Sequence, residues 1–302
     1  MSTPVIGHSL GKVGIVPYEL RHEKNLASIT LDQLIWPDQA ADLNIPTGAC
    51  ISELGESDYV VVYPSSTRLL NRFRGVTCKV VLLMAEPLAI HKRYYRLIWL
   101  LRHKFAIIFC RYDYYASTYD NVIQFAVAES WVEVDADDIA SQKKHHCSII
   151  ASEKRELVGH KLRHDVIAWL KNEGHNVDAL GRGYQPFDKK QEGLLPYTYS
   201  VVIENVQEPD YFTEKLLDCL ICGTLPIYFG PQNIGNYFNL QGIICCQSLS
   251  DIQIAITTSI NPPTKVQIAA MAENRMIALT YSNLQKRIVD TIRSNVRMLS
   301  PH

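Results

Sequence analysis

One stretch of the chain, from Tyr199 to Gly230, holds the polar residues whose spacing is best suited to chemistry. Lys215 lies in the first turn of a predicted helix there, where its charge opposes the positive end of the helix dipole. A bound anion would reconcile this lysine with the free N–H groups of the turn, as phosphates do at helix N-termini. The alternative is that Lys215 pairs with Glu208, Asp210 or Glu214 on a solvated surface.

The elements around Lys215 form a predicted crossover unit of a parallel sheet. Ser200–Ile203 and Leu225–Phe229 are apolar runs typical of buried strands. A polar turn, Glu204–Asp210, follows the first strand, and the helix begins after Asp210 or Thr213. In open parallel sheets ligands bind beyond the carboxyl ends of the strands, which here is the polar turn and the start of the helix. Because the charge of Lys215 is locally unfavourable at this helix end, we expect the Lys215→Ala change to be neutral or slightly stabilising for the free protein.

The run ENxxxxDYxTEKLxDxLxxGTxPIYxG, from Glu204 to Gly230, resembles the C-terminal signature of the α1,3-fucosyltransferases, glycosyltransferase family ten. A weaker resemblance extends from about Ser148 to Leu249. The resemblance implies two Rossmann-like domains that face a cleft, the GT-B type, with the sugar nucleotide in the C-terminal half. The sequence departs from the family pattern at Ile203, where an aromatic residue commonly stands, and at Val206, where a serine is common.

The same resemblance implies that five side chains bind the donor: Arg163, Asn205, Tyr211, Glu214 and Lys215. Asn205, Tyr211 and Glu214 would hold the ribose, phosphates or fucose. Lys215 and an arginine near the start of a preceding helix would contact the diphosphate, and the planar fork of arginine suits phosphate oxygens. Arg163 matches best by its spacing to Gly174, and Arg155 is the alternative. Without the resemblance, these basic residues would be read as a solvated helix face.

Glu86 is the candidate catalytic base. It directly follows the predicted strand Lys79–Met84, at the edge where α/β domains place functional groups. Family members carry a comparable glutamate followed by serine or asparagine, whereas Pro87 stands here. The alternatives are that Glu86 is an ordinary exposed loop residue, and that Glu129 or Glu133 is the base.

Alternating strands and helices predict an α/β fold with parallel sheets along the whole chain. In the N-terminal half the expected strands are 13–17, 58–63, 79–84, 106–110 and 122–127, and the expected helices are 23–34, 66–73 and 91–104. In the C-terminal half the expected strands are 147–151, 177–180, 200–203, 225–229 and 243–246, and the expected helices include 155–173, 249–259 and one long or two broken helices over 264–295.

The 302 residues are enough for two domains. We expect an N-terminal acceptor-side domain over 1–133, a linker over 134–147 and a donor domain over 148–302. In two-domain glycosyltransferases of this kind, the last helix often crosses back to the first domain. The linker contains Asp135 and Asp137, a DxD pair that holds a metal in another glycosyltransferase class, but an acidic linker without a metal is favoured.

Composition excludes several other classes. The net charge is −1, which gives no sign of a nucleic-acid partner. Cys219 and Cys222 fall inside an apolar helix, and Cys245 and Cys246 should point to opposite faces of a strand, so we interpret the eight cysteines as buried thiols. Neither a signal sequence nor a membrane-spanning run is visible in the sequence, which indicates a soluble, cytoplasmic protein of bacterial or viral origin.

Together these features predict an inverting fucosyltransferase that transfers fucose from GDP-fucose to a hydroxyl of an oligosaccharide, without a metal or other cofactor. One alternative is the same fold acting on another GDP-sugar. Another is a catalytically silent protein that binds glycans or nucleotides. The sequence does not predict the acceptor, the linkage or the oligomeric state.

Overall fold

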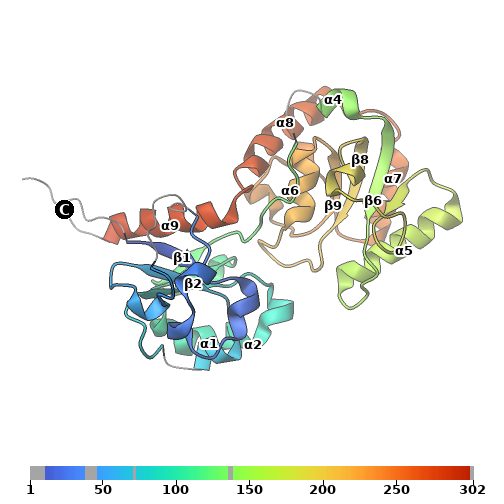
Figure 1. Ribbon diagram of the computed structural model, residues 1–302. Coiled ribbons are helices and arrows are strands. Elements are labelled where there is room, and N and C mark those ends of the chain that lie inside the picture. Colours follow the sequence, from blue (N-terminus) through green and yellow to red (C-terminus); the bar gives the residue numbers. More distant parts are fainter. Residues whose placement is uncertain (1–10, 38–45, 71–72, 135–138, 300–302) are drawn as a thin grey trace, which may run out of the picture. The chain divides into compact units, whose positions relative to one another are not determined.

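The computed structural model describes residues 11–37, 46–70, 73–134 and 139–299, and Figure 1 shows their helices and strands. The chain divides into two compact units. Unit 1 runs to Phe125 and includes the C-terminal segment from Gln285, and unit 2 is Ala126–Leu284. The strand β6 begins at His145, inside the segment expected to be a linker, and His145 and His146 are therefore strand residues. Asp135 and Asp137 lie outside the described residues.

Unit 1 contains a parallel sheet in the order β1-β2-β3-β4-β5, each strand beside its neighbour in sequence. The strands are β1 (Val13–Ile15), β2 (Tyr59–Val62), β3 (Lys79–Leu83), β4 (Ile107–Cys110) and β5 (Val122–Gln124). The helices are α1 (Ser66–Leu70), α2 (Leu88–Leu101), α3 (Asp113–Thr118) and α9 (Leu284–Leu299). β2, β3 and β4 are buried on both faces, as apolar runs in a covered parallel sheet should be.

The prediction of a helix over Glu23–Leu34 was wrong. Two short 3₁₀ turns, Leu26–Ser28 and Leu31–Gln33, stand there instead. The backbone between them pairs with a distant segment, because Leu31 N donates to Ala49 O and Ile51 N donates to Ile29 O. These non-local hydrogen bonds replace the local ones of a helix while the apolar side chains still reach the core.

Unit 2 contains a second parallel sheet, in the order β10-β9-β8-β6-β7. The strands are β6 (His145–Ile150), β7 (Asp178–Leu180), β8 (Tyr197–Ile203), β9 (Leu225–Phe229) and β10 (Ile244–Cys246). The helices are α4 (Ile139–Gln142), α5 (Val158–Glu173), α6 (Glu214–Ile221), α7 (Leu249–Thr258) and α8 (Lys265–Leu279). From β6 the chain adds β7 on one side and then β8 on the other, so the strand order reverses between β6 and β8. Such a switch point is where α/β sheets bind ligands.

Both faces of the unit 2 sheet are covered. Alternate residues of β8 point to opposite faces, so Val201 and Ile203 join α5 and α7 in one core cluster while Val202 joins α6 and α8 in another. The predicted strand Leu225–Phe229 agrees with β9 at both ends. All eight cysteines are free thiols, but the prediction that all of them are buried was wrong for Cys245, which is exposed, and for Cys50, which is partly exposed. Cys245 and Cys246 differ in exposure because neighbouring residues of a strand point to opposite faces.

A glycine lets α5 approach the end of β8. A Cβ placed on Gly159 would lie 1.7 Å from the carbonyl oxygen of Glu204, which is far inside van der Waals contact. Gly159 N also donates to Asn205 O at 3.0 Å. The first turn of α5 therefore rests directly on the backbone that follows β8, a packing that only glycine permits.

We expect the Gly159→Ala change to destabilise the protein by about 1–3 kcal/mol through overpacking, although alanine favours a helix. That loss lowers the melting temperature by roughly 2–4 °C per kcal/mol. Thermal melts of both proteins measure it. Gly55→Ala is the matched control, because its nearest neighbour would be Asp58 Oδ2 at 3.7 Å. A Gly159→Ala variant that melts at or above the wild-type temperature would contradict the close approach.

Candidate functional site

A buried carboxylate joins the end of β8 to the start of α6. Glu204 is 0% exposed and follows β8 directly. Its Oε1 accepts a hydrogen bond from Thr213 N at 2.9 Å, and its Oε2 accepts one from Thr213 Oγ1 at 2.7 Å. Tyr228 OH, from β9, donates to Oε1 at 3.3 Å. Thr213 is the N-cap of α6, the second of the two caps expected, and its side chain accepts from Lys215 N.

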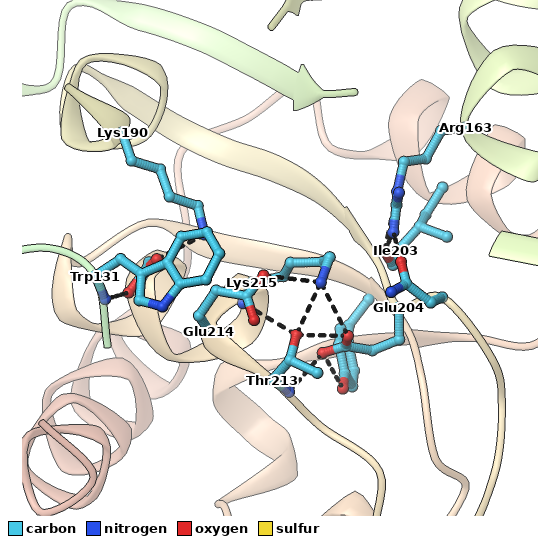
Figure 2. A network of polar contacts seen from close by, with 11 residues as sticks. Trp131, Arg163, Lys190, Ile203, Glu204, Thr213, Glu214 and Lys215 are labelled. Carbon is cyan, nitrogen blue, oxygen red and sulfur yellow. Dashed lines mark hydrogen bonds and ion pairs between the residues drawn. The ribbon is translucent and has the colours of Figure 1, made fainter. Parts of the chain in front are cut away.

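Lys215 is held by two carboxylates. Its Nζ lies 2.8 Å from Glu214 Oε1 and 3.8 Å from Glu204 Oε2, and it donates to Thr213 Oγ1 at 3.1 Å (Figure 2). The side chain is 24% exposed, so this is a half-buried ion pair and not a solvated one. The expectation that the charge of Lys215 is locally unfavourable was wrong, because its ammonium lies within ion-pair distance of two carboxylates, and the nearer one is Glu214, a partner that the sequence had left open.

The two carboxylates respond differently to this environment. Burial raises the pKa of Glu204, and Lys215 opposes that effect without cancelling it. Burial also acts to raise the pKa of Glu214, but Lys215 and Lys190 outweigh it and leave that pKa below its ordinary value. Glu214 is therefore the ionised partner of Lys215 at neutral pH.

Arg163, from α5, reaches the same edge of the sheet. Its Nε donates to Ile203 O at 3.1 Å, and its Nη2 donates to Ile203 O and to Asn205 Oδ1, the latter at 3.0 Å. Nη1 has no hydrogen-bond partner among the described residues. Burial lowers the pKa of Arg163, while Glu204, Glu214 and Tyr211 act in the opposite sense, which places all three within electrostatic reach. Arg155, the alternative, is exposed and precedes α5.

The loop between Glu204 and α6 is fixed by contacts that sequence reasoning missed. Asp210 has a φ of 61°, unusual for a residue with a side chain. Its N–H donates to Asn233 Oδ1 at 3.0 Å, and its Oδ1 accepts from Asn233 Nδ2 at 2.6 Å and from Tyr237 OH at 2.8 Å. Tyr211, next in the chain, is 4% exposed. The turn after β8 is thus tied to the segment after β9.

A second buried carboxylate, Asp218, lies on α6 one turn beyond Glu214 and was also missed. It is 0% exposed. Its Oδ1 accepts from Trp131 N at 2.8 Å and from Ser130 Oγ at 3.0 Å, and its Oδ2 lies 2.7 Å from Lys190 Nζ. No local signal marks Asp218 as buried, because its partners come from segments far away in the sequence.

Glu86 lies in unit 1, apart from the other predicted site residues, which all belong to unit 2. It follows β3 and is half-buried. Its backbone carbonyl accepts from Tyr95 OH at 3.0 Å, and the neighbouring Leu88 N donates to Tyr112 OH at 2.7 Å, so tyrosines from α2 and the β4–α3 turn hold this loop. Of the alternative bases, Glu129 accepts a hydrogen bond from Leu284 N, and Glu133 is exposed.

Two kinds of feature are missing from the part of the chain that the structure describes. It contains no cluster of three or more His, Cys, Asp or Glu side chains suited to hold a metal ion. No helix in it is long and apolar enough to cross a membrane.

We expect Lys215→Met to destabilise the protein by about 1–3 kcal/mol at pH 7, because two half-buried or buried carboxylates lose their cation. The low folded-state pKa of Glu214 stabilises the wild type above the unfolded pKa and stops doing so as pH falls through the folded value. The difference in the free energy of unfolding between wild type and Lys215→Met should therefore become smaller as the pH falls below about 4.5.

Urea unfolding at pH 7 and pH 4 measures this difference. Lys286→Met is the control, because the 3.3 Å pair between Lys286 and Asp290 is exposed on both sides and should contribute little. Equal stability of Lys215→Met and wild type at pH 7 would show that the carboxylates do not need this cation.

Part of the C-terminal half is similar to known proteins. Residues 140–252 match the family model for glycosyltransferase family 10 (fucosyltransferase), C-terminal part. A putative fucosyltransferase-like protein of Arabidopsis thaliana is 30% identical over 111 residues, which are 36% of this chain and 21% of that protein. Alpha-(1,3)-fucosyltransferase B of Drosophila melanogaster is 28% identical over 129 residues, 41% of this chain and 28% of that protein. The match thus spans less than a third of either relative.

The fold extends further than the sequence match. The structure of Anabaena HepE, solved in complex with UDP-glucose, superposes with a TM-score of 0.54 at 12% identity and covers 78% of each chain. TarM superposes with a TM-score of 0.53 at 7% identity, over 79% of this chain and 55% of the other. The chain therefore contains two parallel-sheet α/β units with the GT-B fold, and the segment that resembles glycosyltransferase family 10 lies within the second unit.

Proposed function

We propose that this protein is an inverting glycosyltransferase that transfers fucose from GDP-fucose to a hydroxyl of an oligosaccharide, without a metal. The observation that carries the proposal is the pair of cations at the β6/β8 switch point. Arg163 is bound to Ile203 O and Asn205, and Lys215 is bound to Glu214 beside the start of α6. Two fixed cations and a helix N-terminus suit the diphosphate of a nucleotide sugar.

In the proposed reaction, the acceptor hydroxyl attacks the anomeric carbon of fucose from the face opposite the diphosphate. The bond from that carbon to the diphosphate oxygen breaks as the new glycosidic bond forms, and the configuration inverts. Glu86 takes the proton of the hydroxyl as general base. Its place after β3, on a loop held by Tyr95 and Tyr112, suits that role.

Two cations that the fold already orients, Lys215 and Arg163, stabilise the negative charge that develops on the leaving diphosphate. Lys215 is oriented by Glu204 and Glu214, so its ammonium needs little reorganisation when the bond breaks. Arg163 has two of its nitrogens bound to protein, so its guanidinium is likewise held in place before a ligand binds. These two cations take the part that a divalent metal plays in other phosphate-transfer sites.

One observation favours the same reaction with a different GDP-sugar. Val206 stands where the family pattern commonly has a serine, directly after Asn205, and it is 7% exposed. An apolar side chain there cannot donate a hydrogen bond to a sugar hydroxyl. Ile203, the other departure, is a core residue and affects packing only.

Titration calorimetry with GDP, GDP-fucose and GDP-mannose tests the donor. We expect GDP and GDP-fucose to bind and GDP-mannose to bind at least about tenfold more weakly. GDP release from GDP-fucose in the presence of an oligosaccharide library should be unchanged by excess EDTA. Tighter binding of GDP-mannose would favour the other donor, and binding without turnover would indicate a silent binding protein. Turnover lost in EDTA and restored by manganese would contradict the metal-free mechanism.

The Glu86→Gln change separates binding from chemistry. Turnover should fall by about 10²-fold or more, the usual size of a general-base contribution, while GDP-fucose affinity stays near wild type. Steady-state rates and calorimetry on the same preparation measure both. Glu56→Gln is the control, since that side chain is exposed and is not a candidate base. If Glu86→Gln keeps its turnover, the base lies elsewhere, and the same measurements on Glu129→Gln and Glu133→Gln decide between those two residues.

A further inference from the structure

The buried carboxylate of Asp218 binds the backbone of Trp131, a residue whose aromatic side chain is exposed. Trp131 is 68% exposed, yet its backbone N–H donates to Asp218 Oδ1, an atom of a residue with no exposed surface. Ser130, the preceding residue, donates to the same oxygen at 3.0 Å. A buried carboxylate is costly unless it is fully paired, so these contacts hold the segment firmly against α6.

Lys190 fixes the indole from one side. Its ammonium lies 2.7 Å from Asp218 Oδ2 and 4.8 Å from the centroid of the Trp131 ring, a cation–π contact. The side chain of Lys190 is only 17% exposed. Because one face of the ring meets Lys190 while the residue as a whole stays largely exposed, the opposite face remains open to a planar ligand.

The indole belongs to the same network as the proposed donor site. Figure 2 shows Trp131 and Lys190 on the side of Glu214 that is remote from Arg163. Asp218 follows Glu214 by one helical turn, so both lie on one face of α6. Lys190 also contributes to the low pKa of Glu214, which brings the two groups within electrostatic reach. Across the site, two cations are followed by a carboxylate and then by an aromatic ring.

We propose that Trp131 is the nucleobase-binding residue of the donor site, with the base stacked on its open face. The inference rests on the proposed function, because a nucleoside diphosphate has the same order of parts as the site. Its phosphates would meet Arg163 and Lys215, its ribose diol would meet the Glu214 carboxylate, and its base would reach the indole. Asp218 and Lys190 are positioning residues that keep the ring in place.

Calorimetry with GDP and with inorganic pyrophosphate tests the assignment. Trp131→Ala should raise the Kd for GDP by about tenfold or more, the scale of one base–aromatic stack, and leave the Kd for pyrophosphate unchanged. Trp131→Phe should recover part of the loss because it keeps a ring. Trp99→Ala is the control, since Trp99 is 55% exposed but lies in unit 1. Equal GDP affinity of Trp131→Ala and wild type overturns the proposal, as does an equal loss for both ligands.

The same titrations separate this inference from the choice of donor. If wild type binds UDP or ADP more tightly than GDP and Trp131→Ala loses that affinity, the stacking of the base on Trp131 is supported and the assignment of GDP-fucose as donor is contradicted. If GDP affinity survives in Trp131→Ala and only GDP-fucose binding weakens, the ring contacts the sugar and the nucleobase proposal is overturned. Wild type that binds pyrophosphate but no nucleoside diphosphate overturns both.

Discussion

The buried carboxylate of Glu204 is the interaction on which the rest of the site depends. Its two oxygens bind the backbone and side chain of Thr213, the hydroxyl of Tyr228 and the charge of Lys215. It therefore fastens β8, β9 and the start of α6 to one another. An apolar side chain of the same size could fill this space, but it would leave Thr213 N and Tyr228 OH without this acceptor.

The backbone carbonyls of Ile203 and Glu204 also position the helix α5. Arg163 binds the carbonyl of Ile203, and Gly159 packs on the carbonyl of Glu204, so α5 is placed by the same short run of peptide groups that ends β8. Both cations of the proposed donor site, Arg163 and Lys215, are thus positioned by contacts with Ile203 and Glu204 at the end of β8.

Much of this architecture could be predicted from the sequence, because buried parallel strands are apolar runs and glycines mark their ends. β9 and the two-sheet α/β fold follow from such local patterns. The segment 23–34 could not be predicted in this way, since its backbone pairs with residues near Ala49. The position of Lys215 at a helix start pointed to that residue, and the family resemblance pointed to Arg163, but the burial of Glu204 and Asp218 depends on partners brought together only by the fold.

The division of the chain has a consequence for synthesis. Unit 2 is continuous, whereas unit 1 is built from two separate pieces, because α9 from Gln285 onward groups with residues before Phe125. Arg287 of α9 lies over the ring of Phe125, with 4.8 Å between its guanidinium carbon and the ring centroid. Because α9 follows unit 2 in the chain, it is synthesised after that unit, so unit 2 can fold while unit 1 still lacks this helix. The sheet of unit 1 is thus made before unit 2, whereas the helix α9 of unit 1 is made after it.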